Sequence, residues 1–478
     1  MTQPRTAAAP VGPVRHLGVL DAMALVIGIV IGSGIFRSPS LVAANTGEPW
    51  LMFLAWGLGG LLCLCGALAY AELASAYPKV GGEYVFLSRA FGRGVGFLFV
   101  WARLTVIQTG AIAATAYVFG DYMQGLVSLG EYGSLVWALA ATVVLTVMNI
   151  VGLKAGRWTQ NVLTVLKVTG VVAIAVAGLV GTPHAAQVLP VAEAAEAAAP
   201  GAGDFWSALS AFGLAMVFVL WAFGGWNESA YVAGELKGKA RSMLWVLLGS
   251  IGLLTVLYGV TNVAYLRALG MDGMAGAKAV AADAVLAAVG PRAAKAVAVL
   301  VAIAALGGVN GTIFTGARSI CGLGEDFRPL RWLGRWDPRT GTPLIALLVQ
   351  ALMAILLICL PAVGKGTGSG FEAAVQYTAP VYWLFILLTG LSLFVLRRRE
   401  PRVSRPFRVP LVRLTVPLFC LMCGFMVYSS VDYAVRSLIV AEEVTRASQV
   451  GTLVGLAVLA LGAAVYLLFR ERPKGRGA

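Results

Sequence analysis

The amino-acid sequence predicts an all-α polytopic membrane protein with twelve transmembrane helices, built as a five-plus-five inverted repeat with discontinuous helices 1 and 6. Three observations predict this class. The chain has more apolar residues than a soluble protein can bury, it contains charge-free apolar runs of spanning length, and glycines interrupt two spans that are five helices apart.

Composition alone excludes most soluble folds. Of the 478 residues, 59% are hydrophobic and 12% are charged, and the mean hydropathy is +0.84. A water-exposed surface cannot carry that excess of apolar side chain. A helix crosses a bilayer core of ~30 Å with roughly 20 residues. Five runs pass this test without a charged residue: 50–71, 132–153, 242–266, 373–396 and 447–469. They do not alternate as the strands of a membrane barrel do, so helices are expected.

The full pass along the chain predicts twelve spans. They lie near 18–46, 50–77, 94–124, 132–153, 159–181, 205–235, 241–267, 292–324, 341–364, 371–397, 411–431 and 447–470. The segment 272–290 is expected to form a short amphipathic surface helix. Residues 1–17 lack the apolar core of a cleavable signal.

These spans divide the chain into predicted parts. They are an N-terminal tail (1–17), a first inverted repeat (18–181), an extracellular loop (182–204), a second inverted repeat (205–397), helices 11 and 12 (398–470) and a C-terminal tail (471–478).

The distribution of lysine and arginine predicts the orientation. If the N-terminus is cytoplasmic, the inside segments hold 25 of these residues and the outside segments hold 7. The other four, Arg37, Arg103, Lys167 and Arg318, fall within spans. Positive residues remain inside, so both termini are expected in the cytoplasm of a cell-membrane protein. This bias explains the net charge of +14, and no basic soluble domain is present that could bind nucleic acid.

The sequence carries no signature of an enzyme, a metal site or a cofactor. All six cysteines, Cys63, Cys65, Cys321, Cys359, Cys420 and Cys423, lie inside predicted spans with no zinc or disulfide spacing. No nucleophile with a base and no cofactor fingerprint is found. His16 and His184 fall in loops, which argues against a histidine proton relay.

Helix 1 contains three glycines, Gly28, Gly32 and Gly34, within seven residues. Each costs ~1 kcal/mol relative to alanine in a helix interior. One interpretation is close helix packing, because Gly28 and Gly32 have the spacing that lets backbones approach. The other is an unwound stretch that exposes N–H groups near Ser33 and Gly34. Helix 1 alone supports the two interpretations about equally.

Helix 6 favours the unwound interpretation. Gly224 and Gly225 interrupt its apolar run, and Asn227 and Glu228 follow. Glycine interruptions at corresponding places in two halves point to a transporter site at the bilayer midplane.

A broken helix offers N–H groups at one end and C=O groups at the other, and a zwitterion satisfies both. The carboxylate is expected on the N–H groups of residues 32–35 and the ammonium on the C=O groups of Trp221, Ala222 and Gly224. The predicted substrate-binding residues are Val30, Gly32, Ser33, Gly34, Ile35, Trp221, Ala222, Gly224 and Asn227.

At these motifs the chain resembles the amino acid–polyamine–organocation (APC) superfamily. GSGIF at 32–36, YAEL at 70–73 and GGEYVFL at 81–87 are similar to its opening pattern. FGGWN at 223–227 and GVNG at 308–311 resemble the L-type amino acid transporter branch. The resemblance covers about 15–470. It implies the five-plus-five fold with two added helices, and sodium-independent uptake or exchange of amino acids.

The sequence departs from that branch in two places. Trp221 stands where the branch commonly has a phenylalanine gate, as in the similar arginine–agmatine antiporters. Animal relatives bind a single-span glycoprotein through a cysteine between helices 3 and 4, and residues 121–133 contain no cysteine. A disulfide-linked heavy-chain partner is therefore not expected.

Lys167 lies in the apolar sequence of helix 5, and an intramembrane lysine is expected to face the bundle interior. Snorkelling toward the cytoplasm is the alternative. The resemblance implies that its ammonium occupies the place of a sodium ion, with oxygens of helix 1 around it. Structural ion pairs near the inner mouth are the ordinary interpretation of the other charges, which are Glu72, Arg103, Glu228, Glu235 and Arg318.

The leading hypothesis is sodium-independent exchange of neutral L-amino acids by alternating access. The alternatives are a proton-coupled symporter, in which Lys167 carries the proton, a cationic amino acid or polyamine antiporter, and a non-transporting amino acid sensor. No cofactor is expected, and the expected partners are a small-molecule amino acid substrate and the lipid bilayer.

Overall fold

Long apolar helices make up nearly all of the described chain. The computed structural model describes residues 18–77, 82–151, 157–181, 205–227, 240–326, 328–335, 337, 342–363, 370–440 and 446–469. Within these residues, ten helices are long and apolar enough to cross a membrane. Two of the twelve predicted spans are not among the ten. The span at 18–46 is broken, and the span at 159–181 contains a shorter apolar helix, Val165–Val180.

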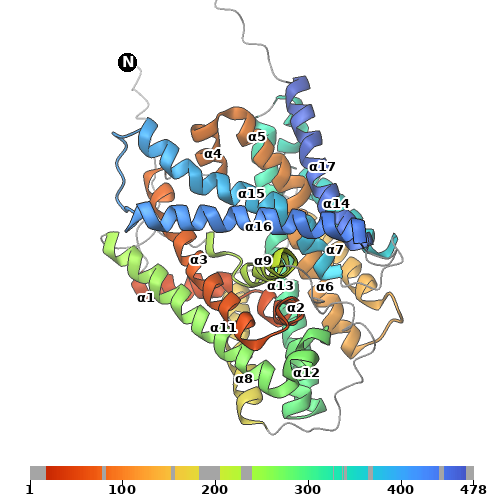
Figure 1. Ribbon diagram of the computed structural model, residues 1–478. Coiled ribbons are helices and arrows are strands. Elements are labelled where there is room, and N and C mark those ends of the chain that lie inside the picture. The colour runs from red at the N-terminus through yellow and green to blue at the C-terminus, as the bar shows by residue number, and fades with distance from the viewer. Residues whose placement is uncertain are drawn as a thin grey trace, which may run out of the picture.

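Figure 1 labels the α-helices, and the elements follow one another along the chain in the order given next. They are α1 (Val19–Val30), η1 (Gly34–Phe36), α2 (Ser38–Thr46), α3 (Pro49–Ala76), α4 (Glu83–Phe91), α5 (Arg93–Ala102), η2 (Arg103–Ile107), α6 (Gln108–Leu126), α7 (Gly133–Ile150), α8 (Arg157–Val180), α9 (Phe205–Ala222), α11 (Ala240–Gly276), α12 (Val280–Ala288), α13 (Pro291–Asp326), η4 (Arg328–Gly334), α14 (Leu344–Val363), α15 (Gly370–Arg399), α16 (Val412–Val440) and α17 (Arg446–Phe469).

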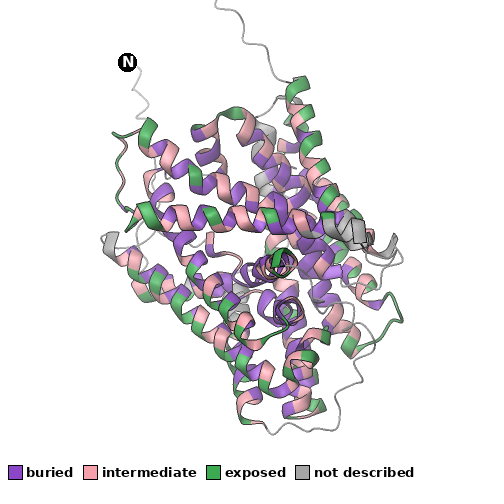
Figure 2. Ribbon diagram, in the orientation of Figure 1, coloured by how far each residue is buried: buried purple, intermediate pink, exposed green. Residues whose placement is uncertain are grey.

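The outer faces of these helices are apolar. On α7 the exposed side chains include Val143, Val144, Val147 and Met148. Figure 2 shows exposed residues along the outward sides of α11 and α16, with buried residues concentrated between the helices. A face of exposed valines is costly in water and favourable against lipid, so the burial pattern fits the bilayer that the composition predicts.

The first predicted span is discontinuous. Regular α-helix ends at Val30, the chain turns at Ile31, Gly32 and Ser33, a 3-10 turn covers Gly34–Phe36, and α2 begins at Ser38. Regular helix also ends at Ala222 in the sixth predicted span, where Gly225 has a φ of +95°. The predicted breaks of helices 1 and 6 are therefore present. The twofold relation between 18–181 and 205–397 stays a prediction.

Three local features differ from the prediction. A nine-residue helix, α4, lies between the second and third spans. The third span has a π-helical stretch, η2, between α5 and α6. The expected surface helix at 272–290 is divided: α11 kinks at Gly270, and α12 begins only at Val280 and buries one face. Glycine takes the left-handed conformation at this kink without a Cβ clash.

The two ends of the molecule are chemically distinct. The α4 end, at the top of Figure 1, holds a buried carboxylate, Glu72, which accepts hydrogen bonds from Arg397 and from the Val409 backbone. On the surface beside it, the Arg89 hydrogen bond lowers the pKa of Glu400. The α12 end lies at the bottom of the same view. These ion pairs bear out the ordinary interpretation of Glu72 as structural.

Candidate substrate-binding site

The helix breaks face a cavity of about 450 Å³ in the middle of the bundle. Residues of the first break (Gly28, Val30, Gly32, Ser33 and Gly34) and of the second (Trp221, Ala222, Gly224, Gly225 and Asn227) line it. Its other walls come from α6, α8, α13 and α15. The side chains and glycines of those walls include Ala111, Thr115, Lys167, Gly307, Gly308, Gly311, Val375, Thr378 and Tyr382.

The first break presents a row of backbone donors. Beyond it, Phe36 N bonds to Ser33 O at 3.2 Å and Arg37 N bonds to Gly34 O at 3.0 Å. The N–H groups of residues 32–35 have no acceptor among the described residues. A buried N–H group without an acceptor costs ~1–3 kcal/mol, so these donors favour an anionic or carbonyl group in the cavity.

The carbonyls of the two breaks meet behind the cavity at Tyr258 of α11. Its hydroxyl lies 3.2 Å from Ala222 O and 3.4 Å from Val30 O, and the side chain is fully buried. Trp221 O accepts the Gly224 N–H at 2.9 Å. Each carbonyl keeps a second lone pair, so it can still accept from an ammonium.

Glycine brings the two breaks into backbone contact. A Cβ on Gly34 would lie 2.5 Å from Ala222 Cα, and one on Gly225 would lie 2.9 Å from Ile29 Cγ2. Any side chain at position 34 would therefore displace α9 before it reached a ligand. Helix 1 is thus unwound at this point, and its close approach to helix 6 is made by Gly34; a Cβ on Gly32, one of the two glycines of the packing interpretation, would meet only Val30 O, at 3.8 Å.

Lys167 reaches the cavity from α8, with 8% of its surface exposed. The expected ring of helix 1 oxygens is absent: no hydrogen bond joins the ammonium to another described residue. Lys167 and the residues of the first break line the same cavity, so open space separates the ammonium from the helix 1 carbonyls. The side chain does face the bundle interior, as predicted, and its ammonium is next to the substrate space.

Glu83, Arg103 and Asn227 form the mouth of the cavity toward the α4 end. The Asn227 amide donates to Glu83 Oε1 at 3.0 Å, and Arg103 Nη1 lies 3.9 Å from Glu83 Oε2. Arg103 keeps 24% of its side chain exposed. Asn227 thus belongs to the mouth and lies beside the cavity, and the Glu83–Arg103 pair is among the ion pairs expected at this end.

Toward the α12 end the cavity is closed by aromatic rings. Trp221 packs edge-on against Phe371 at 6.1 Å between centroids, and Phe218 stacks on the same ring at 6.4 Å. Phe371 is fully buried, whereas Gly311 and Thr315 toward the α4 end are exposed. Solvent therefore reaches the cavity from the α4 end.

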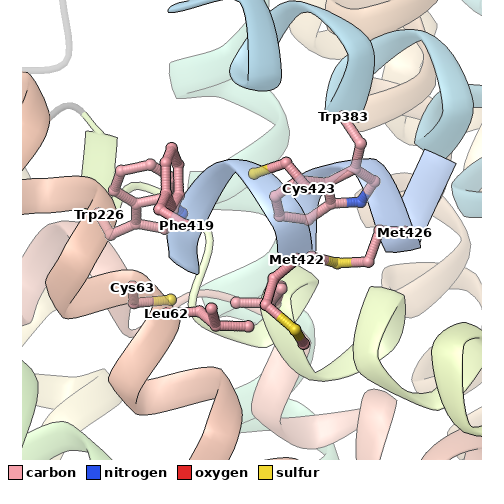
Figure 3. Close-up of a pocket in the computed structure, with 9 residues that line it drawn as sticks. Leu62, Cys63, Trp226, Trp383, Phe419, Met422, Cys423 and Met426 are labelled. Carbon is pink, nitrogen blue, oxygen red and sulfur yellow. The ribbon is translucent and has the colours of Figure 1, made fainter. Parts of the chain in front are cut away.

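A second, much smaller space lies behind the second break (Figure 3). Leu62, Cys63, Trp226, Trp383, Phe419, Met422, Cys423 and Met426 surround it, and it is too narrow to hold a water molecule. Its walls present almost no polar surface, so it is a packing void. The five cysteines whose side chains are described are all free.

The comparisons with known proteins agree with this geometry. The sequence profile of the amino acid permease family matches residues 17–458, which is most of the chain. The chain belongs to the amino acid permease family. The resemblance to the APC superfamily is thereby confirmed.

The relatives of this permease match along most of their length. The b(0,+)-type amino acid transporter 1 of Mus musculus is 30% identical over 427 residues, 88% of this chain and 84% of the relative. The Asc-type amino acid transporter 1 of Mus musculus is 30% identical over 428 residues, 86% and 77% respectively. The serine/threonine exchanger SteT of Bacillus subtilis is 27% identical over 423 residues, 87% and 91% respectively.

All but one of the residues predicted to bind substrate line the cavity of this permease. The exception is Ile35, which is fully buried behind the break. Sequence reasoning missed Tyr258, Thr115 and Thr378, because a tyrosine or threonine in an apolar helix carries no local signal. Glu228 and Glu235 lie outside the described residues, and the side chain of Arg318 lies outside the described side chains.

Proposed function

We propose that this permease transports amino acids across the cell membrane by alternating access, as a sodium-independent exchanger of neutral L-amino acids. One observation carries the proposal. The N–H groups of Gly32, Ser33 and Gly34, which have no acceptor among the described residues, lie at the same cavity as Val30, Trp221 and Ala222, whose carbonyls can each accept a further hydrogen bond. A carboxylate and an α-ammonium fit these two groups of backbone atoms, and no catalytic side chain is needed.

The charges around the cavity favour neutral substrates. Lys167 and Arg103 are cations at its wall and mouth, and the carboxylate of Glu83 is already shared by Arg103 and Asn227. A basic substrate side chain would meet two positive groups without a free carboxylate among the described lining residues. This argues against the cationic amino acid or polyamine alternative.

The orientation is part of the proposal. With both termini in the cytoplasm, as the lysine and arginine distribution predicts, the α4 end faces inward. The conformation described here is then open to the cytoplasm and closed to the outside. No disulfide-linked heavy chain is expected, since residues 121–133 contain no cysteine.

A second function, proton-coupled symport, is favoured by Lys167. A buried ammonium without hydrogen-bond partners among the described residues is disfavoured relative to the neutral amine. Lys167 can then give up a proton during the cycle, whereas in an exchanger it is a fixed cation.

Uptake measurements in proteoliposomes distinguish exchange from proton-coupled symport. Uptake of labelled L-serine, L-leucine and L-arginine is measured with and without internal amino acid, in sodium or choline buffer, and with or without an inward proton gradient. Exchange predicts uptake of the neutral substrates only into preloaded vesicles, unaffected by sodium. Uptake into empty vesicles driven by the proton gradient would establish symport. Sodium-stimulated uptake would contradict both.

Lys167→Met removes the ammonium and keeps the length of the side chain. For symport, the variant is expected to lose the response to the gradient; for exchange, it is expected to lower the rate in all buffers alike. Lys295→Met is the matched control, because Lys295 is exposed on α13 and does not line the cavity. The control is expected to behave as the unmodified protein.

A further inference from the structure

A buried arginine lies directly beyond the aromatic closure of the cavity. Arg37 follows the first break and is 3% exposed. Its Nη1 donates to Ser40 Oγ at 2.5 Å and to Ala277 O at 2.8 Å, and its Nε lies 3.7 Å from Asp121 Oδ2. The guanidinium also lies 6.0 Å from the centre of the Phe371 ring, the same ring that packs on Trp221.

The partners of Arg37 come from several helices at the α12 end. Asp121 belongs to α6, Ala277 to the segment between α11 and α12, and Phe371 to α15. Two more carboxylates interact electrostatically with the guanidinium, Asp283 on α12 and Glu372 on α15. One cation at the junction of η1 and α2 therefore faces three carboxylates on three helices, and Lys278 adds a positive charge near Asp121.

Neighbouring hydrogen bonds hold the same end of the first break. The Tyr122 hydroxyl donates to Phe36 O at 2.7 Å, and it accepts the Ala281 N–H at 3.3 Å. The Tyr265 hydroxyl lies 3.5 Å from Ile35 O. These contacts join η1 to α6, α11 and α12, so α2 cannot move away from them without separating Arg37 from its partners.

We propose that Arg37 is the latch that keeps the α12 end of the cavity closed. The inference rests on the proposed function, since a latch acts only on a cavity that opens alternately to two sides. Its physical basis is the charge balance of the closed state. Poorly solvated carboxylates that lose a neighbouring guanidinium are destabilised, whereas in an open state water solvates them. Removing the positive charge therefore shifts the population toward the conformation open at the α12 end.

The test is thiol labelling from the α12 side. In a background with the six native cysteines replaced by alanine, a Val375→Cys probe lines the cavity on α15. A charged, membrane-impermeant methanethiosulfonate reagent is added to one face of the membrane. Leu129→Cys, exposed in the loop after α6, identifies which face carries the α12 end.

Arg37→Met is expected to raise the labelling rate of the Val375→Cys probe from that face about tenfold, because the rate rises in proportion to the population of the open conformation. Arg37→Lys keeps the charge and is expected to stay near the background rate. Adding Glu372→Gln to Arg37→Met removes one uncompensated carboxylate and is expected to slow labelling again. Arg89→Met, which breaks the exposed pair with Glu400 at the α4 end, is the matched control and leaves the rate unchanged.

Labelling of a folded Arg37→Met protein at the background rate would overturn the latch. Should that variant not fold, Arg37→Gln retains donors for Ala277 and Ser40 while removing the charge, and the same criterion applies to it. Labelling needs no transported substrate. Labelling at the background rate in a protein that exchanges amino acids would refute the latch alone. Labelling as expected in a protein that transports no amino acid would refute the proposed function alone.

Discussion

At the scale of single residues, the hydroxyl of Tyr258 occupies a position that no sequence pattern marks. Its ring packs in the core against Trp56 and Phe223, and its hydroxyl reaches one carbonyl from each broken helix. The hydroxyl has a single proton to share between two acceptors. It therefore fixes the spacing of the two carbonyls that are proposed to receive the ammonium.

Tyr258→Phe removes only this hydroxyl. A hydrogen bond of this kind contributes ~0.5–1.5 kcal/mol, so the affinity for a neutral amino acid is expected to fall about three- to tenfold. Equilibrium binding to the purified protein measures the change. Tyr428→Phe on α16 is the control, because Tyr428 is exposed and lies far from the cavity lining. Equal affinities for the two variants would show that the hydroxyl plays no part in binding.

The residues of the site were predictable where the backbone itself is unusual. Gly32 and Gly34, like Gly224 and Gly225, are costly in a spanning helix, and this cost marks both breaks in the sequence. Contacts made by ordinary side chains left no such mark. Arg37 was visible as a charge within a span, but its partners Asp121 and Ala277 are distant in sequence and no periodicity connects them.

At the scale of elements, α3 packs through glycines. Cβ atoms on Gly59 and Gly60 would collide with Val219 of α9 and Thr255 of α11. One on Gly66 would lie 2.6 Å from the Trp226 ring, which directly follows the second break. Gly57, on the same helix, has nothing within 4 Å. The face of α3 toward α9 and α11 therefore presents backbone without side chains at these positions.

Gly66→Ala is expected to destabilise the protein, since Trp226 and Phe419 must both move; overpacking of this kind costs ~1–3 kcal/mol. Gly57→Ala is expected to be neutral or to stabilise by up to ~1 kcal/mol, because it only improves helix propensity. Thermal unfolding of the detergent-solubilised protein compares them. A higher unfolding temperature for Gly66→Ala than for Gly57→Ala would contradict the packing argument.

Most helices were predictable to within a few residues because apolar runs and charged ends determine them. The elements that were missed lack these signals. Glu83–Phe91 is too short and polar to resemble a span, and the π-helical stretch at Arg103–Ile107 leaves the apolar pattern intact. The kink at Gly270 also has no signal in the sequence, because Gly57 and Gly252 are glycines in apolar helices too and remain helical.

At the scale of the whole molecule, the α12 end is expected to respond to pH. Burial raises the pKa of Asp283 to about 6, opposed by the hydrogen bond that its carboxylate accepts from the Ala279 backbone N–H and by Arg37. A solvated aspartate titrates near ~3.9. The conformation that buries Asp283 therefore binds the proton more tightly and is favoured as the pH falls through 6, whereas above 6 the preference no longer changes. Arg37, Asp121, Glu372, Lys278 and Tyr122 lie in the same cluster.

Lowering the pH on the α12 side from 7 to 5 is thus expected to slow thiol labelling of Val375→Cys from that side several-fold. Asp283→Asn removes the titrating group and keeps the shape, so its labelling rate is expected to change much less over this range. An identical pH response in the asparagine variant would assign the effect to another member of the cluster. Labelling that accelerates on acidification would have the wrong sign for a buried carboxyl.

Fold class and family were predictable from sequence, since composition, glycine breaks and motifs agreed. The direction in which the cavity opens was not, because both conformations of a carrier are encoded by one sequence and differ by only a few kcal/mol.

The narrow void beside Trp226 (Figure 3) makes the protein locally compressible next to the second helix break. Hydrostatic pressure favours whichever conformation occupies the smaller total volume. If the void changes volume when the carrier changes sides, compression acts on the conformational equilibrium directly. Cys63→Ala, which enlarges the void, would then raise the sensitivity of turnover to pressure.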